Sequence, residues 1–153
     1  MFSRKETTEL RKEFWTVFGQ YMAPVLSAEN EKINWINYKT GLKGLQFKMD
    51  AIGHKAWIAI EINHPDLLQQ QIIFEKLGEL RSVFYDALQE DWTWQLHSGN
   101  EQGKIVSKIY AEQTGLSLMR REDWPALISF FKPRIIALDK FWSAVKYGFE
   151  GWQ

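Results

Sequence analysis

Residues 44–63, GLQFKMDAIGHKAWIAIEIN, decide the fold that this sequence predicts. Polar and apolar residues alternate in 44–51 and again in 55–63, which is the pattern of half-buried strands. If Gly53 and His54 form a two-residue loop, glycine takes the first turn position, which needs a positive φ. We therefore expect an antiparallel hairpin here.

This turn also sets the register of the hairpin. It brings apolar residues face to face, Phe47 with Ile60 and Met49 with Ile58. The opposite face then carries the polar residues and one ring: Gln46, Lys48, Asp50, Trp57 and Glu61. A register that places every large aliphatic residue on one side predicts one face packed on a core.

Helices are predicted on both sides of the hairpin in the sequence. Ser3 and Glu6 form a capping box, and apolar residues at helical spacing continue from there to about residue 22. Pro65 suits the first turn of a second helix, whose apolar stripe reaches about residue 89. Asp123 is expected to cap a last helix.

Further strands and one helix irregularity complete the prediction. Strands are expected at 33–39, 92–96 and 104–112, and Pro133 should kink or split the last helix. The order α-β-β-β-α-β-β-α indicates an α+β domain over 1–153, with an antiparallel sheet of about five strands packed with three helices.

Composition excludes several classes of function. The 153 residues hold 19 basic and 19 acidic side chains, so bulk charge does not favour a polyanion partner, and nucleic acid is unsupported by net charge. The chain has no cysteine, which excludes disulfides, thiolate zinc sites and cysteine nucleophiles. No apolar run approaches membrane-spanning length. We expect a soluble cytoplasmic protein without a membrane partner.

Four separated segments resemble one bacterial family, the domain of unknown function 4268. They are residues 35–41 (WINYKTG), 58–63 (IAIEIN), 92–94 (WTW) and 123–125 (DWP). The resemblance extends from about Phe14 to Phe149. It implies a small α+β domain of uncharacterised activity, found alone or at the carboxyl end of longer proteins with a nuclease-like amino-terminal half. It supplies no catalytic residues.

The order of the predicted elements is compatible with one enzyme class, a metal-dependent nuclease. Restriction endonucleases share a helix, three strands, a helix and a strand, with Asp followed by Glu-x-Lys, and Asp50 and Glu61 could supply the two carboxylates. However, Asn63 stands where the lysine is needed. In the predicted register the two carboxylates lie roughly 13 Å apart, which is too far for one metal ion. Lys48 is the closer diagonal neighbour of Glu61, so we expect a structural ion pair.

No other catalytic or metal-binding pattern is present in the sequence. His54, His64 and His97 do not share ligand spacing, and no serine lies in a G-x-S-x-G context. Phosphate-binding glycine motifs are also missing. We therefore predict no catalytic residues, no metal and no cofactor, and an uncharacterised domain that binds a macromolecule, most plausibly a protein. The alternative is a nucleic-acid-acting protein with a restriction-endonuclease-like core, whether active or inactive.

Three groups of residues are candidates for binding, and the first is the polar face of the hairpin with Trp57, Lys48 and Glu61. Trp57, beside Lys48 and Lys39, could stack on a base or contact a partner. We instead expect helices on both faces of the sheet, with Trp57 packed beneath one of them. A basic group near the last helix could contact phosphate, although a solvated helix face was favoured: Arg120, Arg121, Lys132, Arg134 and Lys140.

The carboxyl-terminal aromatic residues predict self-association. Phe141, Trp142, Val145 and Phe149 form a face that is wider than one helix stripe needs. A second surface should cover this face, because aromatic patches are rarely left bare. We therefore predict a homodimer or a protein partner bound through Phe141, Trp142 and Phe149.

Overall fold

The computed structural model describes residues 2–149 and shows an α+β domain. Its helices are α1 (Arg4–Met22), α2 (Leu67–Glu79), α3 (Arg81–Leu88) and α4 (Trp124–Val145). Its strands are β1 (Leu45–Ile52), β2 (Lys55–Ile62), β3 (Thr93–Gly99) and β4 (Ile105–Thr114). Short 3-10 turns, Arg121–Asp123 and Lys146–Phe149, flank α4. The strands form one antiparallel sheet in the order β1-β2-β4-β3.

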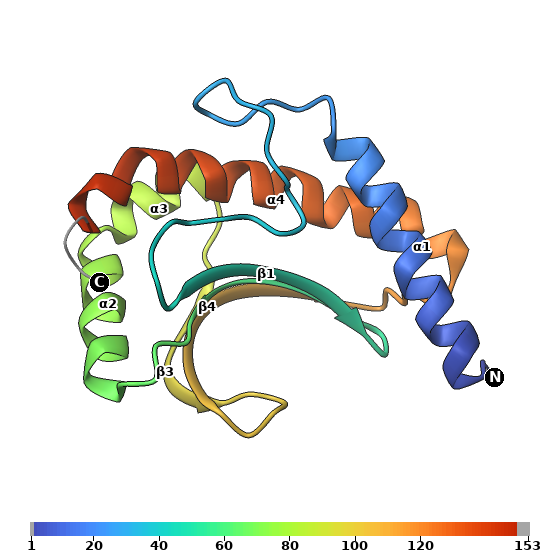
Figure 1. Ribbon diagram of the computed structural model, residues 1–153, viewed down its shortest axis with the longest axis horizontal. Coiled ribbons are helices and arrows are strands. Elements are labelled where there is room, and N and C mark those ends of the chain that lie inside the picture. The colour runs from blue at the N-terminus through green and yellow to red at the C-terminus, as the bar shows by residue number, and fades with distance from the viewer. Residues whose placement is uncertain (1, 150–153) are drawn as a thin grey trace.

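The helices gather on one side of this sheet. Helix α4 runs across the convex side of the curved sheet, with α1 at one end and α2 and α3 at the other (Figure 1). The concave side faces away from these helices, and the loop between β3 and β4 curls beneath it (Figure 1). The domain therefore has two layers, and one face of its sheet is left open.

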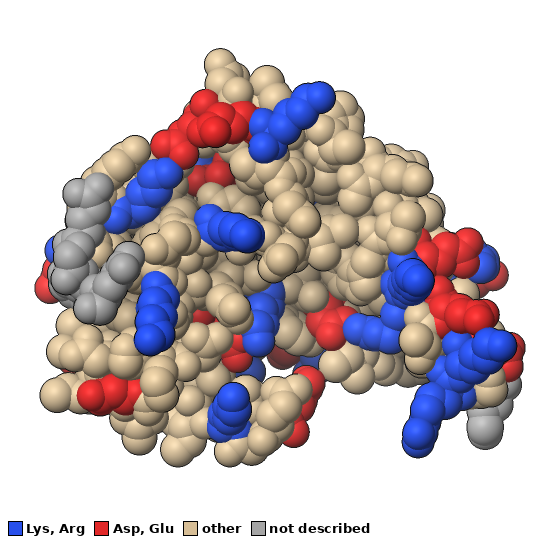
Figure 2. All heavy atoms as spheres, viewed as in Figure 1, with Lys and Arg blue, Asp and Glu red and all other residues tan. Residues whose placement is uncertain are grey.

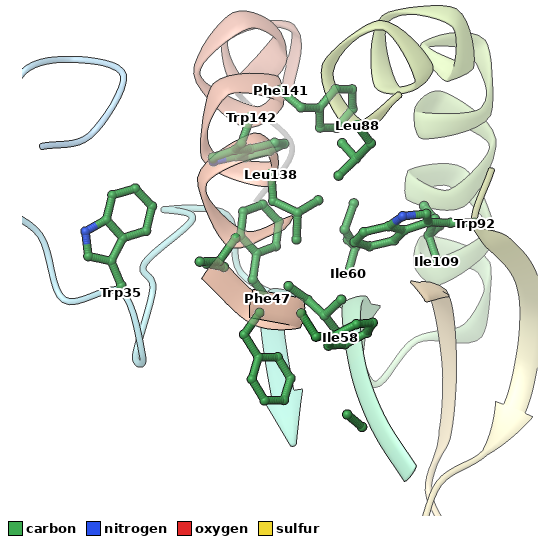
Figure 3. Packing of buried hydrophobic residues seen from close by; sticks show 14 of the residues in the cluster. Trp35, Phe47, Ile58, Ile60, Leu88, Trp92, Ile109, Leu138, Phe141 and Trp142 are labelled. Carbon is green, nitrogen blue, oxygen red and sulfur yellow. The ribbon is translucent and has the colours of Figure 1, made fainter. Parts of the chain in front are cut away.

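The hydrophobic core lies between the sheet and the helices. Ile58, Ile60 and Ile109 point from the strands toward Leu138 and Phe141 of α4 (Figure 3). Each buried side chain of this kind contributes about 1.5–3 kcal/mol by leaving water. The apolar face of the hairpin thus forms the side of the core that lies opposite the helices.

The predicted hairpin is confirmed residue by residue. Phe47 pairs with Ile60, and Gln46 pairs with Glu61, as the turn requires. Gly53 has φ +61° in the loop between β1 and β2, where a side chain would be strained. The alternation of the sequence and the turn chemistry agree here, so the register follows from local information.

The predicted strand at 33–39 is wrong, and the sheet has four strands instead of about five. The Asn34 side chain accepts hydrogen bonds from the backbone N–H groups of Ile36 and Asn37, at 3.1 and 3.0 Å. Such a local turn removes the donors that a strand would pair. Trp35 is buried and donates to the Val25 carbonyl at 3.0 Å, so this segment packs as an ordered loop.

The helices also differ from the prediction. The expected helix at 65–89 is interrupted at Leu80 (φ −101°, ψ 15°), which gives four helices in the described chain instead of three. Conversely, α4 continues through Pro133. Pro133 and Ser129 are both exposed, so water can reach the carbonyl that lacks its N–H partner. Asp123 does not cap α4 with its side chain, which accepts from the Ser117 N–H instead.

A buried polar network joins α2 to the sheet. Gln70, 1% exposed, donates to the carbonyls of His64 and Ile105, each at 2.8 Å. Its carbonyl oxygen accepts from the Ser107 hydroxyl at 3.1 Å, and that hydroxyl accepts from the His97 N–H at 3.0 Å. His97 has φ +49° and lies in the irregular step of β3 between Gln95 and Ser98.

Candidate functional site

The open face of the sheet forms a concave groove of about 910 Å³. Its floor comes from β1, β2 and β4, and its rims come from the loop at 99–102 and from residues 36–38 before β1. In the space-filling view, basic and acidic side chains are interleaved around the hollow beneath the sheet (Figure 2). This groove is the candidate binding site, because it is a concave surface with apolar and polar side chains on one face of the sheet.

The floor is a regular grid of side chains. Three rows cross it from β1 through β2 to β4: Asp50–Trp57–Glu112, Lys48–Ala59–Tyr110 and Gln46–Glu61–Lys108. Successive rows are two residues apart along each strand, which is about 6.6 Å. Because these residues come from one face of adjacent strands, they share the groove without any loop having to bring them together.

Trp57 lies on this floor and not beneath a helix. The favoured expectation was that helices cover both faces of the sheet and bury Trp57, and the one-sided helix layer shows that this is wrong. The indole is half-buried by its neighbours on the sheet and lines the groove. Its apolar surface is therefore available to a bound molecule.

The predicted ion pair between Lys48 and Glu61 is present. Lys48 Nζ lies 2.5 Å from Glu61 Oε2. Glu61 is only 7% exposed, and its Oε2 accepts no hydrogen bond from residues 2–149. The groove floor thus contains a buried carboxylate held by charge attraction to one flexible lysine.

Asp50 belongs to a different ion pair. Arg11 of α1 pairs with Asp50 and donates to the Ala51 carbonyl at 2.9 Å, which ties α1 to the end of β1. Asp50 stands opposite Trp57, four residues along the ladder from the position opposite Glu61. The two carboxylates therefore do not converge on one metal position. Residues 2–149 contain no group of three His, Asp or Glu that could hold a metal ion.

Lys108 is a third lysine of the groove, beside Lys48 and Lys55. Its Nζ lies 4.7 Å from the centre of the Tyr110 ring, and Lys108 is in none of the ion pairs among the described residues. Lys55 at the other end of the floor pairs with Glu112 at 3.5 Å. Sequence reasoning missed Lys108 and Tyr110, because only the pairing of β4 with β2 places them beside Glu61.

The carboxyl-terminal aromatic residues close the core instead of forming an outer surface. Phe141, Trp142 and Phe149 are each at most 3% exposed. Trp142 Nε1 donates to the Thr40 carbonyl at 2.8 Å, and its ring packs against Phe149. The predicted exposed aromatic face is therefore wrong, because the turn at 146–149 folds back on α4 and the loop before β1 covers the rest.

The basic residues near α4 are largely neutralised. Arg121 contacts both carboxylate oxygens of Glu13, and Arg134 does the same with Glu90. These bidentate pairs occupy the guanidinium donors that phosphate would need. The favoured solvated helix face, rather than a phosphate patch, agrees with this arrangement.

A second, smaller cavity of about 310 Å³ surrounds Asp139. Asp139 is buried on α4 and accepts from the Tyr38 hydroxyl at 2.6 Å and from the Ala28 N–H at 2.7 Å. Burial and this hydrogen bond raise the pKa of Tyr38 well above its usual value. These contacts attach the loop before β1 to α4. The sequence signal was an aspartate within the apolar stripe of the last helix.

The chain was compared with known proteins. The family model for the domain of unknown function 4268 matches residues 10–146. The comparison with curated proteins found no match, and neither did the comparison with solved structures. None of the helices formed by residues 2–149 has the length and apolar character that crossing a membrane requires. Because the model matches most of the chain, the protein belongs to the domain of unknown function 4268 family.

Proposed function

We propose that this protein is a non-catalytic domain that binds a segment of a partner protein in the concave groove of its sheet. The observation that carries the proposal is the uncovered sheet face with its cavity of about 910 Å³. A cavity of this size on a regular sheet can accommodate an extended chain segment. The half-buried ring of Trp57 supplies apolar contact area, and the polar residues around it supply hydrogen-bonding groups.

The charges of the groove favour a protein over a nucleic acid. The three carboxylates on the floor are each paired with a cation: Asp50 with Arg11, Glu61 with Lys48 and Glu112 with Lys55. Glu101 adds a further carboxylate at the rim. The phosphodiester backbone of a nucleic acid would be repelled by these carboxylates along its path. A protein segment carries fewer charges, and they are of both signs.

A nucleic-acid ligand is the second candidate. Trp57 and Tyr110 occupy adjacent rows of the open sheet face beside Lys48 and Lys108. Aromatic rings and basic residues on an open sheet are typical of proteins that stack single-stranded bases. A restriction-endonuclease core needs three strands between its first two helices. This chain has two there, β1 and β2, because residues 33–39 form a loop.

Photocrosslinking in cells tests the proposal and separates the two ligand classes. A photoreactive amino acid replaces Gln46, which is exposed on the groove floor, and Gln71, exposed on α2, is the matched control position. We expect a crosslinked adduct only at residue 46. Nuclease treatment should leave the mass of this adduct unchanged, because the captured molecule is a protein. Ala59→Phe, which fills the middle of the floor, should abolish the adduct, whereas Ala126→Phe on exposed α4 should not. A nuclease-sensitive adduct would contradict the protein proposal and support the nucleic-acid candidate.

Location and oligomeric state belong to the same proposal. We propose that the domain acts in the cytoplasm, where it meets its partner. The homodimer expected from the sequence stays a prediction, and sedimentation of the full chain tests it. The buried positions of Phe141, Trp142 and Phe149 remove the surface on which that prediction was based.

A further inference from the structure

We infer that the segment bound in the groove carries an acidic side chain, whose carboxylate binds Lys108, and an apolar side chain two positions away that packs on Trp57. This inference rests on the proposed function, because it names the chemistry of the occupant of the same groove. It concerns a protein segment in an extended conformation that lies along the strands.

The acidic residue follows from the pairing of charges in the groove. Each floor carboxylate already has a cation, and Lys48, Lys55 and Arg11 are used in those pairs. Lys108 lies against the face of Tyr110 and pairs with no carboxylate of residues 2–149. Lys108 is half-buried, so part of its hydration is already lost. A carboxylate from the partner would give Lys108 an ion-pair partner inside the groove.

The position and negative charge of Glu61 limit where that carboxylate can bind. Glu61 lies directly across from Lys108 on β2, and its charge is compensated by Lys48 on the other side. Lys108 Nζ is turned toward Tyr110, one row away from Glu61. An incoming carboxylate thus meets the ammonium group in the row of Ala59 and Tyr110, away from the row of Glu61. Ala59 is the smallest side chain in this row.

The spacing of the two recognised side chains follows from the grid. Trp57 lies one row from Tyr110, diagonally across β2 and β4. One row is two residues, about 6.6 Å, which is also the distance between successive side chains on one face of an extended segment. A segment that places its carboxylate at Lys108 therefore places its second neighbour over Trp57. An aliphatic or aromatic residue would bury its surface there.

A random peptide library displayed on phage tests this inference with the full-length chain. Selection on the wild type should enrich an acidic residue with an apolar residue two positions away. Synthetic peptides of that sequence should bind Lys108→Glu at least about tenfold more weakly, because a hydrogen bond to a charged group is lost. Lys108→Gln should show a smaller loss in the same direction, and it covers the case in which Lys108→Glu does not fold. Lys140→Glu, exposed on α4, is the charge-matched control and should bind as the wild type.

The outcomes separate this inference from the proposed function. The groove proposal stands if Ala59→Phe abolishes peptide binding and Ala126→Phe does not. The inference is nevertheless wrong if the bound peptides show no acidic preference, or if Lys108→Glu and Lys108→Gln bind them as the wild type does. If no peptide is selected, or if Ala59→Phe binds selected peptides as well as the wild type does, the groove proposal itself is wrong.

Discussion

Tyr38 donates a hydrogen bond of 2.6 Å to Asp139, although the two residues are 101 positions apart. Asp139 lies on α4, and Tyr38 belongs to the loop that precedes β1. The same carboxylate accepts from the Ala28 N–H at the start of this loop. One buried aspartate therefore fixes two points of a long connection that has little regular structure of its own.

Tyr38→Phe should change how stability depends on pH. Burial and the bond to Asp139 raise the pKa of Tyr38 in the folded chain. Its contribution is thus complete below the unfolded pKa of about 10 and is lost as pH rises from there toward the folded pKa. We expect the free energy of unfolding of the wild type to fall between about pH 9 and 11 more steeply than that of Tyr38→Phe. Urea titrations measure it, and Tyr21→Phe, at an exposed residue, should retain the wild-type slope.

Trp57→Ala and Trp92→Ala should differ sharply in stability. Trp92 is 4% exposed and packs edge-on against Phe84, so its loss should cost about 3–5 kcal/mol. Trp57 lies on the open face, and its loss should cost about 1 kcal/mol because little of the core is emptied. Chemical denaturation of both variants checks this. Equal losses would show that something covers the groove in the free protein.

Lys48→Met should destabilise the domain more than Lys55→Met does. Removing Lys48 leaves Glu61 buried without its cation, at a cost of roughly 1–3 kcal/mol. The pair of Lys55 and Glu112 is exposed, and such pairs contribute about 0–1 kcal/mol. The double variant Lys48→Met, Glu61→Met should recover most of the loss, since no uncompensated charge remains. Additive losses in this double variant would contradict the argument.

Trp142→Ala should act on folding and not on assembly. The ring is 3% exposed, contacts Phe149 and donates to Thr40, so we expect a loss of about 3–5 kcal/mol. Sedimentation in native buffer should give the same species for the variant as for the wild type. A change in oligomeric state without a change in stability would restore the interface that the sequence predicted.

Purified protein should leave plasmid DNA intact in the presence of Mg²⁺ or Mn²⁺. The carboxylate of Asp50 is paired with Arg11, and its position on the ladder is four residues from that of Glu61. A restriction-type mechanism requires a metal ion that is bound by both carboxylates. Asp50 and Glu61 are too far apart to bind the same ion. A gel assay measures plasmid cleavage. Cleavage that Glu61→Ala abolishes, but Glu112→Ala does not, would overturn this prediction.

Local patterns predicted the hairpin and the first helix well, because their determinants are neighbours in the chain. Gly53 and the alternation around it set the register of β1 and β2, and Ser3 with Glu6 forms the expected capping box of α1. The loop at 33–39 has strand-like composition, yet the side chain of Asn34 captures its backbone N–H groups. Propensity is a weak guide where a side chain competes for the backbone.

The candidate site was predictable only in part. The hairpin register identified the ion pair of Lys48 and Glu61 from the sequence alone. Lys108 and Tyr110 join these residues through the pairing of β4 with β2, across a connection of 42 residues that contains two helices. Which face the helices would cover depends on how all of them pack together. For that reason Trp57 was expected beneath a helix although its place on the polar face had been recognised.

His97 contributes to the alignment of the last two strands. If β3 slid along β4 by two residues, every side chain would keep its face, so the apolar pattern does not oppose that error. Such a slip would move the His97 N–H away from the Ser107 hydroxyl and break the chain of bonds that ends at Gln70. It would also move the His97 ring away from the carbonyl of Leu67, the first residue of α2, which lies 3.0 Å from its Nε2. The contacts of His97 with β4 and with α2 therefore favour the observed alignment over one that is shifted by two residues.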